Sequence, residues 1–367
     1  MATARKPDIL SDKLRDHLAR LYPGRRIIEI EPLAPDSGAT ASSTAKVAGY
    51  GQPVRVKLAD QRGDTLELVW RTASPNEFGH DRRADRAAEA ILAFDDFARI
   101  PDHIEALDVG VIRANGELIS LRDAGEHYLL TTYARGSIYA DDLRRIATAG
   151  AGDPDLARAD ALAHYLARLH TPLGDPVAYR RAVRDLIGHG EGIYGIVDGY
   201  PADTPAAPCE RLQDIEARCA EWRWRLRDHE ARLVRTHGDF HPFNVVFREG
   251  TDFTLLDASR GACGEPADDV TAMIVNYLLF ALDADGAWSR GLRTLWHRFW
   301  ISYLYARPDP HLFDVAPPWF AWRALVVCNP RFYPGMTERA RDTLLGFAEA
   351  MLDAERMDPW SVDELFP

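Results

Sequence analysis

The sequence predicts an α+β fold with two lobes, in which a small antiparallel sheet comes first and a mainly helical region follows. Runs with strand character lie almost entirely before residue 136, whereas apolar residues beyond Gly136 recur mostly at helical spacing. The length of 367 residues suits two lobes or two compact units. With 46% apolar and 27% charged residues, the composition is that of a folded globular chain and excludes wholesale disorder.

The first lobe is predicted to hold short strands and two helices. The strand-like runs are Arg26–Leu33, Pro53–Leu58, Thr65–Thr72, Val109–Ile112, Glu117–Leu121 and Tyr128–Tyr133. Turn residues at Arg62-Gly63-Asp64 and at Asn115-Gly116 join four of these runs into two hairpins. Helical spacing covers residues 9–22 and Asp81–Phe97.

The second lobe is predicted to be helical. Helical spacing covers Asp153–His170, part of Glu210–Thr236, and the segments 266–284, 287–306, 317–328 and 337–354. A stretch rich in Gly and Pro at 172–208 gives weak signals. The last helices carry aromatic residues that either fill the core or stack on a ligand, namely Trp296, Trp300, Tyr303, Trp319, Trp322, Phe332 and Tyr333.

The chain carries 44 Lys and Arg against 56 Asp and Glu, a formal net charge of −12. This acid excess argues against a nucleic-acid partner, which would need a basic face, but it is compatible with a cationic small molecule such as an amino sugar. Because the apolar runs are too short to span a membrane and the N-terminus has no apolar signal region, we expect a cytoplasmic protein without a membrane partner. The sequence gives no indication of oligomeric state.

A polar cluster of His, Asp, His and Asn precedes a short apolar strand at Val245–Phe247. A turn leads to a second short strand, Phe253–Leu256, which ends in Asp257. A hairpin of this kind places Asn244 and Asp257 near the same end, where two hard oxygen ligands would suit Mg²⁺. Asp239 could then accept the proton of a hydroxyl nucleophile.

The motif His-Gly-Asp-x-His-x-x-Asn at residues 237–244, followed by Asp257 at the end of the second strand, closely resembles that of the aminoglycoside phosphotransferase / choline kinase superfamily. The run Gly264–Asp269 resembles a second motif of that superfamily. Its members are small-molecule kinases with a two-lobed protein-kinase-like fold. The resemblance implies an N-terminal lobe, a hinge and a C-terminal lobe that holds the catalytic loop and the acceptor site, at residues 1–130, 131–136 and 137–367.

The resemblance also assigns roles to the residues of these motifs. Asp239 would be the catalytic base. Asn244 and Asp257 would hold Mg²⁺, with Mn²⁺ as an alternative, on the phosphates of ATP or GTP. His237 and Asp269 would support the catalytic loop.

The first lobe should supply the groups that bind the nucleotide. By the same resemblance, Arg71 on the third strand would bind the phosphates and Glu89 on the next helix would hold it, with Lys57 as the rival cation. Residues 36–44 would cover the phosphates with backbone N–H and hydroxyl donors. The hinge groups that would meet the adenine are the backbone atoms of Thr132 and Ala134.

The sequence therefore predicts a phosphotransferase that moves the γ-phosphate of ATP to a hydroxyl of a small molecule, which is an aminoglycoside, an amino sugar, a sugar or an amino alcohol. One alternative is a catalytically silent protein of the same fold that binds a nucleotide or another ligand. A second is a zinc hydrolase with His237, Asp239 and His241 as metal ligands. Asp268 is interpreted as a solvated neighbour of Asp269.

Overall fold

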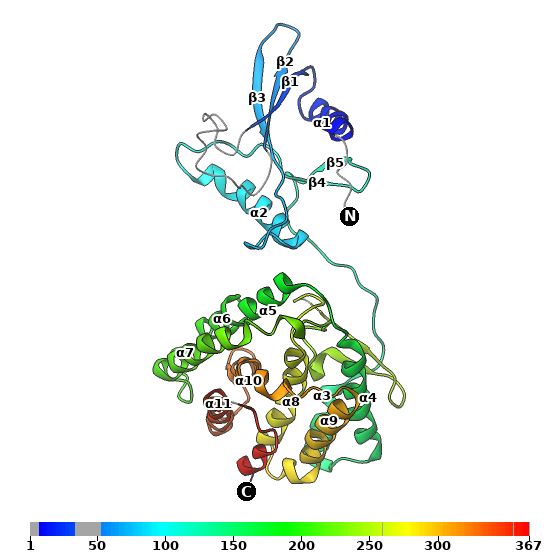
Figure 1. Cartoon of the computed structure of the whole chain (residues 1–367), viewed down its shortest axis with the longest axis vertical. Helices are drawn as coiled ribbons and strands as arrows, with labels where there is room; N and C mark the ends of the chain where they lie inside the picture. Colours follow the sequence, from blue (N-terminus) through cyan, green and yellow to red (C-terminus); the bar gives the residue numbers. More distant parts are fainter. Residues whose placement is uncertain (1–6, 34–52, 259, 355, 367) are drawn as a thin grey trace. The chain divides into compact units, whose positions relative to one another are not determined.

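The computed structural model describes residues 7–33, 53–258, 260–354 and 356–366. The chain divides into two compact units, Met1–Thr131 and Thr132–Pro367 (Figure 1). The first unit contains small antiparallel sheets, and the second is mainly helical. The predicted α+β class is therefore confirmed, whereas the hinge at 131–136 stays a prediction.

The first unit is built on a three-stranded antiparallel sheet with a helix beside it. Its elements are α1 (Pro7–Leu21), β1 (Arg26–Pro32), β2 (Val54–Ala59) and β3 (Thr65–Trp70), with the strand order β1-β2-β3. Val56 and Leu58 alternate along β2 and form a small core with Leu14 and Leu18 of α1. Gly63 supplies the positive φ, 89°, of the β2–β3 turn, so the predicted hairpin is confirmed.

A second helix and a short hairpin complete the first unit. They are α2 (Arg83–Asp96), η1 (Phe97–Arg99), β4 (Gly110–Ile112) and β5 (Leu118–Ser120). The carboxylate of Asp108 lies 2.8 Å from Nε2 of His17 on α1 and accepts the hydroxyl of Ser120, so the hairpin is fastened to α1. The predicted strand at Tyr128–Tyr133 is wrong, because this segment forms no ladder with any described strand.

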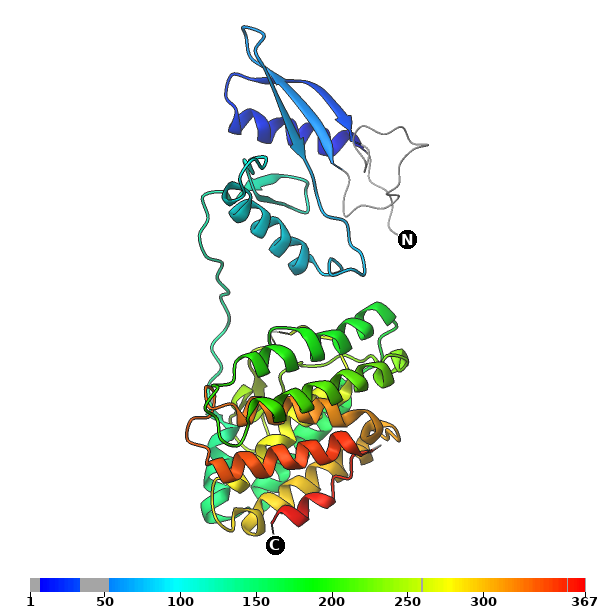
Figure 2. The ribbon, with the colours of Figure 1, turned by 90° about the vertical axis from the view of Figure 1, so that its left-hand side faces the viewer.

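The helices of the second unit gather into one bundle (Figures 1 and 2). They are α3 (Tyr139–Ala149), α4 (Asp153–Leu169), α5 (Pro176–Gly188), α6 (Ile193–Asp198), α7 (Cys209–Leu226), α8 (Pro266–Leu282), α9 (Arg293–Ala306), α10 (Leu312–Cys328) and α11 (Glu338–Asp353), with short turns η2 (Glu230–Arg232), η4 (Trp288–Leu292) and η5 (Ser361–Leu365). Helix α8 is buried along nearly its whole length and packs against α10. These two helices therefore form the centre of the core.

Two parts of the helical unit differ from the sequence prediction. Helix α10 begins at Leu312 and runs through Pro317 and Pro318, although proline is normally confined to the first turn of a helix. The weak stretch at 172–208 contains α5 and α6. Asp175 caps α5 by accepting two backbone N–H groups just before a proline, a helix-start signal that was available in the sequence.

A small sheet lies inside the helical unit, with the order β6 (Ser137–Ile138), β7 (Val245–Phe247) and β8 (Phe253–Leu255). It confirms, to within one residue, the hairpin predicted from the strands Val245–Phe247 and Phe253–Leu256. The aromatic residues of the last helices fall into two classes. Phe332 is exposed and Tyr333 is half-buried, so these two are not part of the buried core. The others pack in the core, and they are Trp296, Trp300, Tyr303, Trp319 and Trp322.

The segment 36–44, predicted to cover the phosphates, lies outside the described residues. In the part of the chain that the structure describes, no helix is both long and apolar enough to cross a membrane.

Candidate active site

The β7–β8 hairpin brings Asn244 and Asp257 together. The register pairs Val245 with Leu255, and the backbone N–H of Leu256 donates to the carbonyl oxygen of Asn244 at 2.9 Å. Asn244 therefore precedes one strand and Asp257 follows the other at the same end of the hairpin. Asp257 has a positive φ of 38°, an uncommon conformation for which Asp is among the better-suited residues.

The side-chain amide of Asn244 connects the three predicted catalytic positions. Its Nδ2 donates to the carbonyl oxygen of Asp239 at 3.0 Å and reaches that of Asp257 at 3.5 Å. Nδ2 also lies 3.4 Å from Oδ2 of Asp239, so Oδ1 is the atom of this amide that remains for a ligand. The exposed carboxylate of Asp257 makes no ion pair with any described residue. Two open oxygen donors at one hairpin end are a set that fits Mg²⁺.

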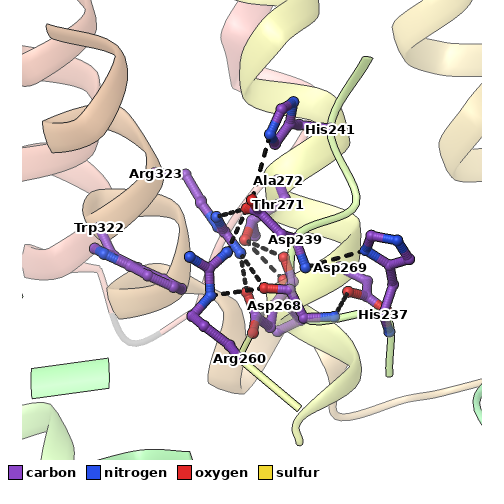
Figure 3. Close-up of polar contacts among 12 residues, drawn as sticks. His237, Asp239, His241, Arg260, Asp268, Asp269, Thr271, Ala272, Trp322 and Arg323 are labelled. Atoms are coloured by element: carbon purple, nitrogen blue, oxygen red, sulfur yellow. Dashed lines mark hydrogen bonds and ion pairs between the residues drawn. The ribbon is translucent and has the colours of Figure 1, made fainter. Parts of the chain in front are cut away.

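Asp269 supports the loop at residues 237–244, the predicted catalytic loop, from the first turn of α8 (Figure 3). Its fully buried carboxylate accepts the backbone N–H groups of His237 at 2.7 Å and Gly238 at 2.8 Å. Burial would raise the pKa of Asp269, but its hydrogen bond with His170 and those from the loop lower that pKa. Nε2 of His170 lies 3.2 Å from Asp269, and its Nδ1 lies 2.7 Å from the hydroxyl of Tyr303. A continuous buried network therefore holds the loop.

His237 is placed inside the loop rather than at its rim. Its ring is nearly buried, and its Nδ1 accepts the backbone N–H of Asp239 at 3.3 Å. This contact orients the backbone at Asp239. For the zinc alternative, three ligands would have to converge, and the described residues contain no such group of three His, Cys, Asp or Glu side chains.

Two arginines and a histidine surround the carboxylate of Asp239 (Figure 3). Nη1 of Arg323 lies 2.9 Å from Oδ1, Arg260 forms a second ion pair with the same oxygen, and Nε2 of His241 lies 3.4 Å from Oδ2. Burial alone would raise the pKa of Asp239. The hydrogen bond from His241 and the charges of Arg323 and Arg260 outweigh burial and hold that pKa well below its usual range. The two arginines and His241 therefore favour the anionic form of Asp239.

Asp268 is buried and not solvated, so the prediction for this residue is wrong. Its side chain forms an ion pair with Arg323, because α10 packs against the first turn of α8. Burial is the main cause that raises the pKa of Asp268. The guanidinium carbon of Arg323 also lies 4.0 Å from the ring centroid of Trp322, and that of Arg260 lies 4.8 Å from the same ring. Trp322 therefore supports both cations that hold Asp239.

A cavity of about 210 Å³ opens beside Asp239. Its polar lining residues are Glu191, Asp239, His241, Arg260, Asn276 and Arg323. The rest of the lining is apolar or aromatic and comes from α6, α8, α10 and the turn after α10. Tyr333 belongs to that turn, and burial, helped by the charge of Asp239, raises its pKa to about 12, so its phenol stays protonated.

The candidate nucleotide-binding residues of the first unit are not paired as predicted. Glu89 lies 3.1 Å from Nε2 of His80, and the guanidinium of Arg71 lies 5.6 Å from the ring centroid of Phe97. Arg71 follows the last residue of β3, so its side chain reaches η1 instead of the face of α2 that carries Glu89. Lys57 lies 3.4 Å from Glu67 on the neighbouring strand. Thr132 and Ala134 lie in a segment without regular structure.

The chain matches the phosphotransferase enzyme family, APH, over residues 63–311. The chain belongs to this family. The match covers more than half of the sequence and includes the catalytic loop and the motif that contains Asp269. The protein is a small-molecule kinase, as the motifs predict.

Several solved structures resemble this phosphotransferase. A glucosamine kinase has 15% identity over 95% of this chain and 97% of its own, with a TM-score of 0.40. The macrolide 2′-phosphotransferase of Brachybacterium faecium has 18% identity over 95% and 100%, with a TM-score of 0.31. A choline/ethanolamine kinase family protein from Mesorhizobium loti has 14% identity over 94% and 95%, with a TM-score of 0.36. No curated protein matches the chain.

Three residues of the candidate site were not predicted from the sequence. Arg323 is the single charged residue in the apolar run 317–328, and a lone charge on a buried helix signals a buried partner. Arg260 lies in the loop after Asp257, and nothing in the local sequence marks it as a partner of Asp239. His170 ends a helix, where its contact with Asp269 has no local sequence signal.

Proposed function

We propose that the protein transfers the γ-phosphate of ATP, or of GTP, to a hydroxyl group of a small molecule, with Asp239 as the base. The convergence of Asp239, Asn244 and Asp257 supports this proposal, since the amide of Asn244 donates to the carbonyl of one aspartate and reaches that of the other. Oδ1 of Asn244 and the carboxylate of Asp257 would hold Mg²⁺ or Mn²⁺. The metal would neutralise and align the phosphates.

In the transfer, a bond forms between the acceptor oxygen and the γ-phosphorus while the bond from that phosphorus to the β–γ bridging oxygen breaks. Asp239 accepts a hydrogen bond from the acceptor hydroxyl and aims its oxygen, and the proton passes to the carboxylate late, because the transition state is loose. ADP leaves with the bridging oxygen. A carboxylate with a lowered pKa suits this orienting role better than early proton abstraction.

The remaining nucleotide-binding residues stay part of this proposal. Arg71, or Lys57 as its rival, would bind the phosphates, and Glu89 would hold the cation when nucleotide is present. Backbone groups at Thr132 and Ala134 would receive the adenine. Arg71→Ala and Lys57→Ala, made separately, distinguish the two cations. Loss of the true phosphate ligand should raise KM for ATP far more than loss of the other cation.

The test is ADP release with ATP, Mg²⁺ and a panel of hydroxyl compounds. Asp239→Asn should lower kcat by about 10²–10⁴-fold. Asp257→Asn should abolish metal-dependent nucleotide binding. Asp252→Asn is the matched control, because Asp252 lies at the far end of the same hairpin, where its exposed side chain pairs with Arg248. Equal turnover in wild type and Asp239→Asn would refute the proposal, and nucleotide binding without turnover in any variant would favour the catalytically silent alternative.

A further inference from the structure

The cavity beside Asp239 lies between one face of α8 and one face of α10. Each helix contributes residues at positions i, i+3 and i+4, which are Ala272, Val275 and Asn276 from α8 and Arg323, Val326 and Val327 from α10. Because both helices are buried, these faces define the chemistry that an acceptor meets next to the proposed base.

The charges of this lining compensate one another. Arg260 pairs with Asp239 and lies 3.7 Å from the carboxylate of Glu191. Arg323 lies between Asp239 at 2.9 Å and the buried Asp268. Every carboxylate among the described lining residues therefore already has an arginine partner. An ammonium group that entered the cavity would lose its hydration without gaining an uncommitted counter-ion.

One polar group in the lining does lack a partner. Asn276 is 3% exposed, and its Nδ2 donates to the carbonyl oxygen of Ala272 at 2.8 Å. This contact fixes the orientation of the amide, because the flipped rotamer would set two oxygen atoms against each other. Its Oδ1 has no hydrogen-bond partner in the described part of the chain. Asn276 belongs to the cavity lining, so its buried, unpartnered acceptor calls for a donor that a ligand can supply.

The remaining wall is apolar. Ile196 of α6 joins the aliphatic residues of α8 and α10, and the aromatic rings of Phe332 and Tyr333 close the lining from the turn after α10. Phe332 is 56% exposed, so its ring is available to cover a ligand. A surface of this kind stabilises a ligand with an apolar flank.

We propose that the acceptor is an uncharged hydroxyl compound with an apolar flank, such as a neutral glycoside, and that Asn276 accepts a hydrogen bond from one of its hydroxyl groups. The site discriminates against compounds with several ammonium groups, although the whole chain carries a net charge of −12. The paired charges of the lining decide the preference for a neutral acceptor, and the net charge of the chain does not, because the ligand loses its hydration only inside the cavity. This inference rests on the proposed function for the identity of the transferred group.

The first experiment compares acceptors with the full chain, ATP and Mg²⁺ by ADP release at low ionic strength. The panel contains a neutral aryl glucoside, glucosamine with its single ammonium group, and the multiply charged aminoglycoside tobramycin. We expect kcat/KM for the glucoside to exceed that for tobramycin at least tenfold. A higher kcat/KM for tobramycin or for glucosamine would overturn the inference while leaving the phosphotransferase proposal intact.

Two substitutions of Asn276 test whether its acceptor oxygen and the lack of an unpaired carboxylate set the preference for a neutral acceptor. Asn276→Leu should raise KM for the glucoside several-fold and leave KM for ATP unchanged. Asn276→Asp adds a carboxylate without an arginine partner, so it should raise the ratio of kcat/KM for glucosamine to that for the glucoside at least tenfold. Asn329→Asp is the matched control, because Asn329 is a second buried asparagine, 1% exposed, outside the cavity lining. An equal ratio in Asn276→Asp and wild type would overturn the role of Asn276.

Calorimetric titration of the nucleotide-free protein with the same three compounds separates this inference from the proposed function. If no compound stimulates ADP release but the glucoside binds more tightly than both amines, the phosphotransferase proposal fails and the inference on the cavity stands. If tobramycin binds most tightly, or if none of the three compounds binds, the inference fails.

Discussion

The guanidinium of Arg323 lies 2.9 Å from the carboxylate of Asp239, although 84 positions separate the two residues in the chain. The same side chain pairs with Asp268 and donates to the carbonyl oxygen of Gly238 at 3.2 Å. Arg323 therefore connects α10, the first turn of α8 and the catalytic loop. The position of the proposed base depends on a helix whose link to the loop does not show in the local sequence.

Replacement of Arg323 by Met should destabilise the protein and alter its pH profile. Removal of one partner from a buried ion pair costs about 3–5 kcal/mol, because Asp239 and Asp268 are left without their shared cation. Without that charge, the pKa of Asp239 rises, so the acid limb of kcat/KM should move to higher pH. Urea unfolding and a pH–rate profile measure the two effects.

Arg298→Met is the control for that variant. Arg298 on α9 also forms an arginine–aspartate pair, 2.7 Å from Asp160, but its side chain is 51% exposed. The loss of an exposed pair should change stability far less and leave the acid limb in place. If Arg323→Met kept the wild-type acid limb, Arg323 would not control the protonation of Asp239.

Asp269 should make the stability of the protein depend on acid pH. Its pKa is lowered in the folded state, so its contribution is fully present above the unfolded value of about 3.9 and is lost as the pH falls through the lower folded value. Asp269→Asn should reduce stability at neutral pH and flatten the loss of stability below about pH 4. Urea unfolding between pH 3 and pH 7 measures both changes.

Asp252→Asn serves as the control for that substitution as well. Its side chain is 62% exposed in the β7–β8 turn, so its pair with Arg248 should add little to the acid dependence of folding. A wild-type slope below pH 4 in Asp269→Asn would show that other carboxylates govern the acid unfolding.

The local parts of the site could be predicted from the sequence. Asn244 and Asp257 meet because one short hairpin joins them, and the contact of Asp269 with the loop follows a motif of the superfamily that the sequence resembles. Spacing along a continuous segment is enough for such contacts. The same reasoning predicted the hairpins of the first unit, each of which has its turn residues in the sequence.

The contacts between distant elements could not be predicted in this way. Arg323 and His170 reach the site from helices whose packing depends on the whole core, and one sequence does not say which buried faces meet. The described residues do not form the ion pair expected between Arg71 and Glu89, because Glu89 pairs with His80 and Arg71 lies over Phe97. The start of α10 was also predicted too late, because the helix begins at Leu312 and not at residue 317.

Gly136 should be irreplaceable at the entry to β6. It has a φ of 140°, and a Cβ there would overlap the carbonyl oxygen of Phe247 and lie 2.9 Å from Cγ1 of Val246. Gly136→Ala must therefore push β6 away from β7, the strand that directly follows Asn244. We expect a loss of at least about 2 kcal/mol in the free energy of unfolding, with a fall in kcat because the hairpin loses its neighbour.

Gly174→Ala separates this steric effect from a general effect of removing a glycine. A Cβ at Gly174 meets no atom within 4 Å, so the substitution should leave kcat unchanged and stabilise the protein by up to about 1 kcal/mol through the unfolded chain. Urea unfolding and ADP release compare the two variants directly. Equal stability of Gly136→Ala and Gly174→Ala would mean that β6 can shift without disturbing β7, and that the hairpin holds Asn244 and Asp257 together without this third strand.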